Sequence, residues 1–258
     1  MAKRKHRRMS VTQQEYDDLS RLAHNNVIAR VEGPRTKRWS KHDVRPIHPM
    51  TPNQQIMFDL YDRDQFIIAA GSPGTGKTFL SLYLALTSVV DKSTPYNHIK
   101  IVRSVVPSRE MGHLPGTVEE KSAPYEAVYQ DALHELCGRG DTYKNMKEAG
   151  LISFVPTSFV RGSTWNDTIV IIDEAQNMTW HELHSVITRV GTNSRLLIAG
   201  DGRQCDLNQR KEQSGFYELL KVANIVPQFS TIMFTPDDCV RCDFVKDWLA
   251  ACEKLGYI

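Results

Sequence analysis

Residues 71–78 read Gly-Ser-Pro-Gly-Thr-Gly-Lys-Thr and match the phosphate-binding loop pattern G-x-x-x-x-G-K-[ST] without a mismatch. The apolar run from Gln65 to Ala70 precedes them and reads as a buried strand, and the stretch from Phe79 to Val90 reads as a helix. This context separates a phosphate-binding loop from a chance glycine-rich turn. The sequence therefore predicts a nucleoside triphosphate site formed by Gly71, Ser72, Pro73, Gly74, Thr75, Gly76, Lys77, Thr78 and Phe79.

The residue types of this loop suit phosphate for physical reasons. Glycines allow successive backbone N–H groups to turn toward an anion with no Cβ in the way. A helix that begins near Lys77 adds the positive end of its dipole. We expect Lys77 to reach the β- and γ-phosphates and the Thr78 hydroxyl to be a ligand of Mg²⁺.

A second apolar run, Thr168 to Ile172, ends in two adjacent carboxylates, Asp173 and Glu174. Continuous apolar character is typical of a strand in a parallel sheet, where ligands bind at the carboxyl ends of the strands. We expect Asp173 to hold Mg²⁺, directly or through water, and Glu174 to polarise an attacking water. Alone, the pair could equally be a solvated strand end, but its place after a phosphate-binding loop favours the catalytic interpretation.

A third apolar run, Arg195 to Ala199, is followed by Gly200, Asp201 and, three residues later, Gln204. The pattern G-D-x-x-Q after a strand resembles the third motif of superfamily one helicases, in which the glutamine contacts the γ-phosphate. The alternative is a polar turn that uses glycine for its backbone freedom.

Further motifs follow one another along the chain. Residues 51–54 read Thr-Pro-Asn-Gln, residues 112–125 carry G-x-L-P-G, E-K and P-Y in order, and residues 173–177 read Asp-Glu-Ala-Gln-Asn. From about residue 46 to about residue 245 the chain resembles the PhoH-like proteins, P-loop ATPases of bacteria and phages that are related to superfamily one helicases.

The resemblance implies an α/β fold of the RecA-like P-loop class, with a mostly parallel sheet between helices. It also implies ATP and Mg²⁺ as cofactors, Gln54 as the residue that reads adenine, and Gln204 as the sensor of the γ-phosphate. An arginine finger is expected, with Arg241 as first choice and Arg161 as second. Arg241 is followed by Cys242 where the family usually has an Arg-His pair.

The chain has no room for a second RecA-like domain, from which helicases take their arginine finger. We therefore expect the finger to come from a neighbouring subunit of a homo-oligomer, most simply a hexameric ring. The resemblance further implies a cytoplasmic protein, in the host cytoplasm for a phage member, that acts on single-stranded RNA or DNA, RNA in preference, with a ribonuclease as a partner. Arg103, Arg109 and His113 are the candidate contacts in or beside the loop 104–117, which could instead be a structural lid.

Composition is that of an ordinary soluble globular protein, with 41% hydrophobic and 24% charged residues among 258. This length allows one sizeable core or two small ones. No apolar stretch is long enough for a membrane span, and the basic N-terminus lacks the apolar segment of a secretory signal. Five unevenly spaced cysteines, an odd number, favour reduced thiols in a cytosolic compartment.

Charge divides the chain near residue 46, where we place the start of the ATPase domain, 46–258. Residues 1–45 hold twelve Lys or Arg against five Asp or Glu, a net charge of +7, whereas the remainder holds twenty against twenty-five, a net of −5. This basic extension, with a helix expected from Ser10 to Ile28, could bind phosphates, and Trp39 could stack on bases. A disordered solubilising tail is an equal alternative for residues 1–9.

Strands and helices alternate along residues 46–258, which favours a parallel sheet flanked by helices. Besides those named above, strands are expected over 98–103, 151–155 and 228–234. Helices are expected over 118–136, 142–149, 179–189 and 214–222, and a last helix begins at Thr235. In that last helix Val240, Phe244, Trp248 and Leu249 are expected to be core contacts.

Two other classes of function stay open from the sequence. The chain could be a small-molecule phosphotransferase, although the Asp-Glu pair and the absence of an Arg-rich lid count against that. It could also be a scaffold that binds nucleic acid or recruits a partner under the control of ATP, without separating strands.

Overall fold

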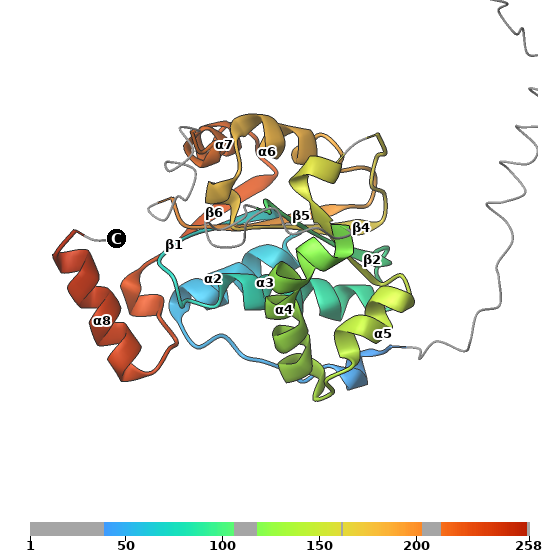
Figure 1. Cartoon of the computed structure of the whole chain (residues 1–258), viewed down its shortest axis with the longest axis horizontal. Helices are drawn as coiled ribbons and strands as arrows, with labels where there is room; N and C mark the ends of the chain where they lie inside the picture. Colours follow the sequence, from blue (N-terminus) through green and yellow to red (C-terminus); the bar gives the residue numbers. More distant parts are fainter. Residues whose placement is uncertain (1–38, 106–117, 161, 203–212, 257–258) are drawn as a thin grey trace, which may run out of the picture. The chain divides into compact units, whose positions relative to one another are not determined.

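The computed structural model describes residues 39–105, 118–160, 162–202 and 213–256, except the side chains of residues 118–121. These residues belong to the compact unit Lys37–Ile258. Its centre is one sheet of six strands in the order β3-β2-β4-β5-β1-β6, with every neighbouring pair parallel (Figure 1). The strands are β1 (Phe66–Gly71), β2 (His98–Arg103), β3 (Ile152–Pro156), β4 (Thr168–Asp173), β5 (Arg195–Gly200) and β6 (Phe229–Phe234). The expected α/β class, with a parallel sheet between helices, is confirmed.

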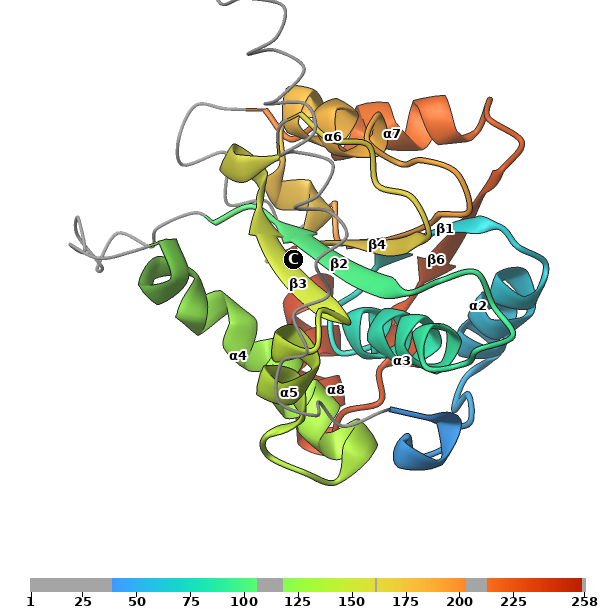
Figure 2. The same ribbon diagram turned by 90° about the vertical axis from the view of Figure 1, so that its right-hand side faces the viewer.

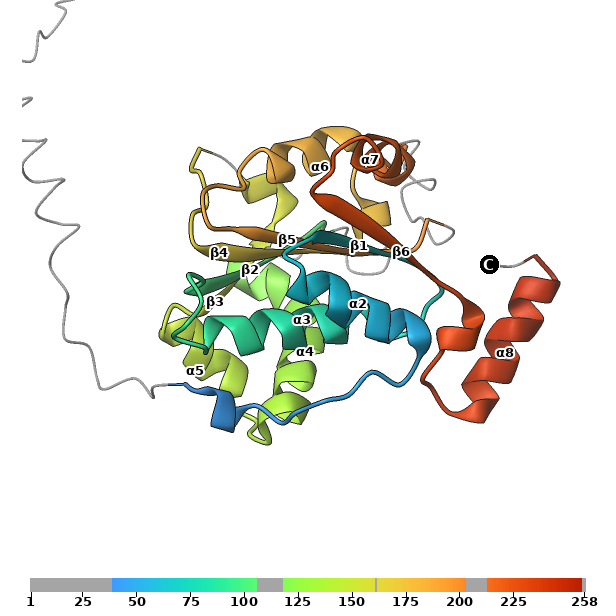
Figure 3. The same ribbon diagram turned by 180° about the vertical axis from the view of Figure 1, so that it is seen from behind.

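Helices cover both faces of this sheet, as Figures 1 and 3 show. The first face carries α2 (Pro52–Asp62), α3 (Lys77–Val89), α4 (Val118–Cys137) and α5 (Thr142–Glu148), and the second carries α6 (Trp180–Ile187) and α7 (Phe216–Ala223). Strands β4 and β5 are buried at every position, which explains their apolar runs Ile169–Ile172 and Leu196–Ala199. The helices and strands expected on either side of residues 71–78 are confirmed.

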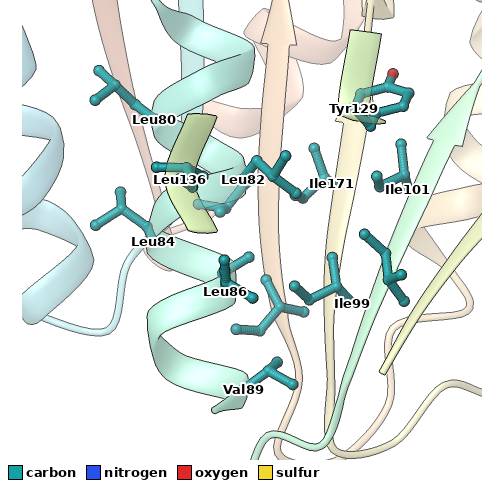
Figure 4. Packing of buried hydrophobic residues seen from close by; sticks show 14 of the residues in the cluster. Leu80, Leu82, Leu84, Leu86, Val89, Ile99, Ile101, Tyr129, Leu136 and Ile171 are labelled. Atoms are coloured by element: carbon teal, nitrogen blue, oxygen red, sulfur yellow. The ribbon is translucent and has the colours of Figure 1, made fainter. Parts of the chain in front are cut away.

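Two hydrophobic layers hold the helices to the sheet. Alternate strand residues such as Ile101 and Ile171 form one hydrophobic cluster with Leu82 and Leu86 of α3 on the first face (Figure 4). Their neighbours in sequence, such as Ile172, pack with the helices of the second face. This division follows from the two-residue period of a strand, and it makes the sheet the shared wall of both layers.

The order of the strands gathers the polar motifs at one edge of the sheet. Strand β1 lies between β5 and β6, while β4 lies between β2 and β5 (Figure 3; Figure 2 shows the same sheet from the side of β3 and β2). All strands run in the same direction, so the residues that follow β1, β4 and β5 come out at the same, carboxyl, edge. The loop 71–78, the pair Asp173 and Glu174, and Asp201 therefore lie close together.

The described chain begins inside the core of the first face. Trp39 is only 6% exposed and Val44 is equally buried, on either side of the short 3₁₀ helix η1 (Lys41–Asp43). The Arg45 N–H donates to the Leu136 carbonyl at 2.7 Å and fixes this segment to the end of α4. The expectation that Trp39 stacks on bases is therefore wrong, because its ring is covered by the protein itself. The expected helix over 10–28 lies outside the described residues.

Helix α2 was not expected, although its start is encoded locally. The Thr51 side chain accepts a hydrogen bond from the Gln54 N–H, and Pro52 occupies the first turn, where it has no N–H to leave unpaired. The prolines before and at its start made this segment read as a linker. Within the described ranges, every helix is too short or too polar to cross a bilayer.

The C-terminal region differs from expectation in two ways. Thr235 starts only a 3₁₀ turn, η5 (Pro236–Asp238), and the last helix, α8 (Asp243–Lys254), begins later in the chain. Its aromatic residues are not core contacts: Phe244 is 73% exposed and Trp248 is 62% exposed. The capping signal at Thr235 was real, but the chain leaves the helical path after one turn, at Cys239.

Candidate functional site

The loop 71–78 has a backbone that only glycine permits at defined positions. Gly71 has a φ of +117°, and a Cβ there would lie 2.0 Å from the carbonyl oxygen of Phe234. Gly76 has a φ of +84° and precedes the first residue of α3. The chain therefore turns sharply between β1 and α3, so that the N–H groups of the first helical turn open toward the space above the loop.

Lys77 lies against this loop. Its ammonium group donates to the carbonyl oxygens of Gly71 at 2.8 Å and Ser72 at 2.6 Å. The buried hydroxyl of Thr75 also donates to the Ser72 carbonyl, at 3.0 Å, which stiffens the turn. The positive charge is thus held where a phosphate group cradled by the loop would meet it.

Gln54 connects the loop to the segment before α2. Its Nε2 donates to the Thr75 carbonyl at 3.1 Å, and its Oε1 accepts from the Met50 N–H at 2.8 Å. The side chain is buried. Both ends of the amide therefore support the protein backbone, and the reading of adenine by Gln54 stays a prediction.

Asp173, at the end of β4, is buried and faces the first turn of α3. Its Oδ1 accepts the hydroxyl of Thr78 at 2.7 Å, and its Oδ2 accepts the hydroxyl of Tyr129 at 2.7 Å. The nearest guanidinium nitrogen of Arg103 lies 3.8 Å from the same Oδ2. Thr78 and Asp173 thus offer adjacent hard oxygen atoms at the phosphate end of the loop, a donor set that suits Mg²⁺.

Glu174 adopts a left-handed backbone conformation, with a φ of 52°, which is uncommon outside glycine and which turns the chain away from β4. Burial, and then the charge of Asp173, raise the pKa of the Glu174 carboxyl above its ordinary value. Its Oε2 accepts a hydrogen bond of 2.6 Å from Gln176, whose Oε1 accepts the Asp201 N–H at 3.0 Å. Gln176 therefore ties Glu174 to the end of β5.

A cavity of about 830 Å³ lies over the loop. Its wall includes residues of the loop and the carboxylates Asp173 and Glu174, and on another side Ile47, His48 and Met50. Helix α4 contributes Val128, Asp131, Ala132 and Glu135. The volume falls in the range of ligand pockets and is large enough for a nucleoside triphosphate.

Arg241 lines the same cavity from its own chain. The Val240 N–H donates to the Gly74 carbonyl at 3.0 Å, and a Cβ on Gly74 would lie 3.0 Å from Cγ of Arg241. The segment between β6 and α8 is therefore attached to the phosphate-binding loop. Arg241 thus lies beside the loop of its own chain, and its role as an arginine finger stays a prediction.

The remaining predicted site residues divide into two groups. Arg103 points toward Asp173 and lies with its guanidinium 5.7 Å from the centre of the Tyr125 ring, so its charge is engaged at the acidic pair. The others lie outside the described residues: Arg109, His113, Arg161 and Gln204.

Two residues of the site were missed from the sequence. Gln176 could have been found, because a glutamine two residues after a candidate catalytic glutamate is well placed to orient it. Tyr129 gave no signal, since an aromatic residue on an amphipathic helix reads as a core residue.

The chain was then compared with known proteins. The family model described as PhoH-like protein matches residues 46–253. The PhoH-like protein of Bacillus subtilis is 32% identical over 81% of this chain and 65% of that protein, and that of Mycobacterium tuberculosis is 31% identical over 79% and 57%. Protein PhoH of Escherichia coli K12 is 31% identical over 89% and 63%. The chain thus spans less than two thirds of the length of these relatives.

Among solved structures, the Pif1 helicase of Candida albicans is 14% identical, with a TM-score of 0.36 over 73% of this chain and 41% of that one. A likeness this distant is too weak to support a conclusion. The match to the family model covers most of the chain, and the relatives cover a similar share at over 30% identity. The chain therefore belongs to the family of PhoH-like proteins.

Proposed function

We propose that this chain binds ATP together with Mg²⁺ in the cavity above the loop 71–78 and hydrolyses it. The observation that carries the proposal is the contact between Thr78 and Asp173, since it joins the hydroxyl of the phosphate-binding loop to a carboxylate at the end of a neighbouring strand. These two residues would hold Mg²⁺. Bound there, the ion would neutralise charge on the β- and γ-phosphates.

The roles of the other residues follow from what phosphoryl transfer needs. The backbone N–H groups of the loop bind the phosphate oxygens, and Lys77 exchanges its carbonyl partners for the β- and γ-phosphates. Glu174 orients the attacking water and accepts its proton, and Gln176 keeps that carboxylate directed. The raised pKa of Glu174 brings its basicity nearer to neutral pH, which suits a general base.

Arg241 is proposed to place its positive charge beside the transferring phosphoryl group, because among the described residues it is the arginine that lines the cavity. Gln204 is proposed as the sensor of the γ-phosphate, and Arg161 as a second arginine. The adenine would lie toward Gln54 and the side of the cavity formed by Ile47, His48 and Met50.

We further propose that hydrolysis is coupled to the binding or remodelling of single-stranded nucleic acid, RNA in preference to DNA. The family membership supports this, together with the net charge of +7 on residues 1–45 against −5 on the remainder. Arg109 and His113 remain candidate contacts. Arg103 is the weaker candidate, since its guanidinium faces Asp173.

A homo-oligomer, proposed as a hexameric ring, fits the exposed aromatic face of α8. No residue of this helix is buried in the chain, and the rings of Phe244 and Trp248 lie side by side with centres 6.4 Å apart. Aromatic side chains are enriched at interfaces between proteins. A second copy of the chain is the proposed partner of this face. A ribonuclease partner and a cytoplasmic location complete the proposal.

The second candidate is a scaffold in which ATP controls the binding of nucleic acid or a partner, without strand separation. One measurement separates the two: steady-state ATP hydrolysis at low salt, alone and with single-stranded RNA or DNA, for the wild type, Lys77→Ala and Glu174→Gln. If one polymer stimulates ATP turnover in the wild type and both variants lose turnover, the result supports an ATPase that is coupled to nucleic acid. The scaffold predicts that polymers leave turnover unchanged and that Glu174→Gln still binds nucleic acid in the presence of ATP.

A further inference from the structure

The two oxygens of Asp173 have different surroundings. Oδ1 faces the Thr78 hydroxyl of the phosphate-binding loop, at 2.7 Å. Oδ2 points the other way, to the hydroxyl of Tyr129 at 2.7 Å and to Arg103 at 3.8 Å. Only 2% of the residue is exposed, so water does not replace these partners. One oxygen is thus directed to the cavity, and the other is held from behind.

Tyr129 is fixed more firmly than an ordinary hydrogen-bond donor. Only 1% of the residue is exposed, and its ring belongs to the hydrophobic layer that contains Ile101 and Ile171 (Figure 4). The Phe154 ring lies with its centre 5.9 Å from that of Tyr129. The phenol group therefore has one available position, and that position is set by the packing of α4 on the sheet.

The Tyr129 hydroxyl is the donor in this contact and Oδ2 of Asp173 is the acceptor. One oxygen of Asp173 is therefore constrained from behind, while the other faces Thr78 at the cavity.

We propose that Tyr129 is a positioning residue for the Mg²⁺ site: its hydroxyl holds Oδ2 of Asp173 so that Oδ1 alone is directed to the ion beside Thr78. The inference rests on the proposed function and adds to it a residue of α4 that touches neither the nucleotide nor the ion. Partners behind metal-binding carboxylates set their orientation, and their loss typically weakens the affinity for the metal by about 10-fold to 100-fold.

The chain offers a matched control for a test of Tyr129. Tyr143, on α5, is also a buried tyrosine that donates to a buried carboxylate, Glu126, at 2.5 Å. That pair is separate from Asp173 and does not line the cavity. Tyr129→Phe and Tyr143→Phe each remove one hydroxyl from one such hydrogen bond, so a general loss of stability should be similar in both variants.

The experiment measures Mn²⁺ binding, by the electron paramagnetic resonance of free Mn²⁺, to the full chain with a non-hydrolysable ATP analogue. For Tyr129→Phe we expect an affinity for Mn²⁺ lower by about 10-fold, with unchanged binding of the analogue in the absence of the ion. Tyr143→Phe should keep the wild-type affinity. Wild-type affinity in Tyr129→Phe, or an equal loss in both variants, would overturn the inference.

A double variant tests the route of the effect. Because Tyr129 acts through the Asp173 carboxylate, Tyr129→Phe should weaken Mn²⁺ binding no further in an Asp173→Asn background, whereas an indirect structural effect would add to it. The binding measurement does not depend on turnover. If the wild type hydrolyses no ATP, the proposed hydrolysis is refuted. If Tyr129→Phe nevertheless binds Mn²⁺ more weakly than the wild type, the positioning role is still supported.

Discussion

The Thr78 hydroxyl donates a 2.7 Å hydrogen bond to Oδ1 of Asp173, and this contact joins two residues that are 95 positions apart in the chain. One comes from the first turn of α3 and the other from the end of β4. Strand β5 separates β4 from β1, which leads into α3, so the contact depends on the pairing of these three strands and tests the fold and the proposed chemistry together.

Thr78→Ala should remove one ion ligand and leave the loop intact. We expect the Mg²⁺ concentration for half-maximal hydrolysis to rise by about 100-fold, with the unfolding transition little changed. Thr78→Ser keeps the hydroxyl and is the control, with a nearly normal Mg²⁺ dependence. A Mg²⁺ titration of turnover checks both variants, and an unchanged dependence in Thr78→Ala would exclude this residue as a ligand.

Gly71 should tolerate no side chain. Gly71→Ala places a Cβ 2.0 Å from the Phe234 carbonyl oxygen at a φ of +117°, whereas Gly150, with a φ of +70°, has open space around the same position. Gly150→Ala should cost about 1 kcal/mol of unfolding free energy from its backbone alone. Gly71→Ala should cost at least about 2 kcal/mol more and abolish nucleotide binding. Urea denaturation measures both, and equal losses would contradict the close approach of β1 and β6.

Arg241 should act on the nucleotide of its own subunit. Arg241→Ala is expected to lower turnover by about 10³-fold. Mixed with Lys77→Ala, it should recover no activity, because no subunit then combines an intact loop with Arg241. Recovery of turnover in mixed oligomers would show instead that the arginine acts across an interface. Mixing wild type with Lys77→Ala under the same conditions gives the reference.

Arg195 should matter far more for stability than its ionic partner. Its buried guanidinium lies 3.9 Å from the centre of the Tyr61 ring and pairs with Asp64 at 2.9 Å, but the Asp64 side chain is 88% exposed. Arg195→Ala should lower the free energy of unfolding by about 3 kcal/mol, because it removes the packing of a buried side chain and leaves the groups around the guanidinium without their partner. Asp64→Asn, which keeps a residue that accepts the positive φ at this position, should cost less than about 1 kcal/mol. Similar losses in chemical denaturation would mean that the ion pair dominates.

His98 should make the fold sensitive to mild acid. Burial, and less so the charge of Lys100, lower its pKa below the ordinary value of 6.5, although its bond to the Gly150 carbonyl acts in the opposite direction. The unfolded chain therefore takes up a proton at pH values where folded His98 is still neutral, so stability is lost as the pH falls from the ordinary value toward the folded one.

The measurement is urea unfolding at about pH 7.5 and about pH 5.5. The difference between the two free energies of unfolding should be smaller in His98→Asn, which cannot titrate and can still donate to the Gly150 carbonyl. A difference as large as that of the wild type would assign the acid sensitivity to other groups.

The parts of this fold that the sequence predicted best are those where local pattern and tertiary environment agree. Strand β4 contains the apolar run Ile169–Ile172 because it is buried at every position, and its end is marked by Asp173. The loop 71–78 was predicted equally well, since its glycines stand at positions where the backbone geometry requires glycine. Such signals do not depend on which distant segment packs against them.

The parts that escaped prediction depend on such distant packing. Nothing in the sequence around Phe244 and Trp248 distinguishes an aromatic face that is exposed from one that is buried, so α8 was assigned to the core. The same limit hid Tyr129, whose ring is an ordinary core residue and whose hydroxyl matters only because β4 ends beside it. The prediction for Trp39 was wrong in the opposite direction: its ring stands among basic residues in the sequence and was expected to be exposed, but it is buried in the core.

The place of β1 between β5 and β6 sets an order of events during synthesis. The ribosome makes β1 early, but its two neighbours are residues 195–200 and 229–234, and the Ser72 N–H needs the carbonyl of Phe234 as its partner, at 3.0 Å. Contacts so distant in sequence form late. While β6 is still inside the ribosome, the nascent chain therefore has no complete phosphate-binding loop. The ability to bind nucleotide should appear only when nearly all of the sheet has left the ribosome.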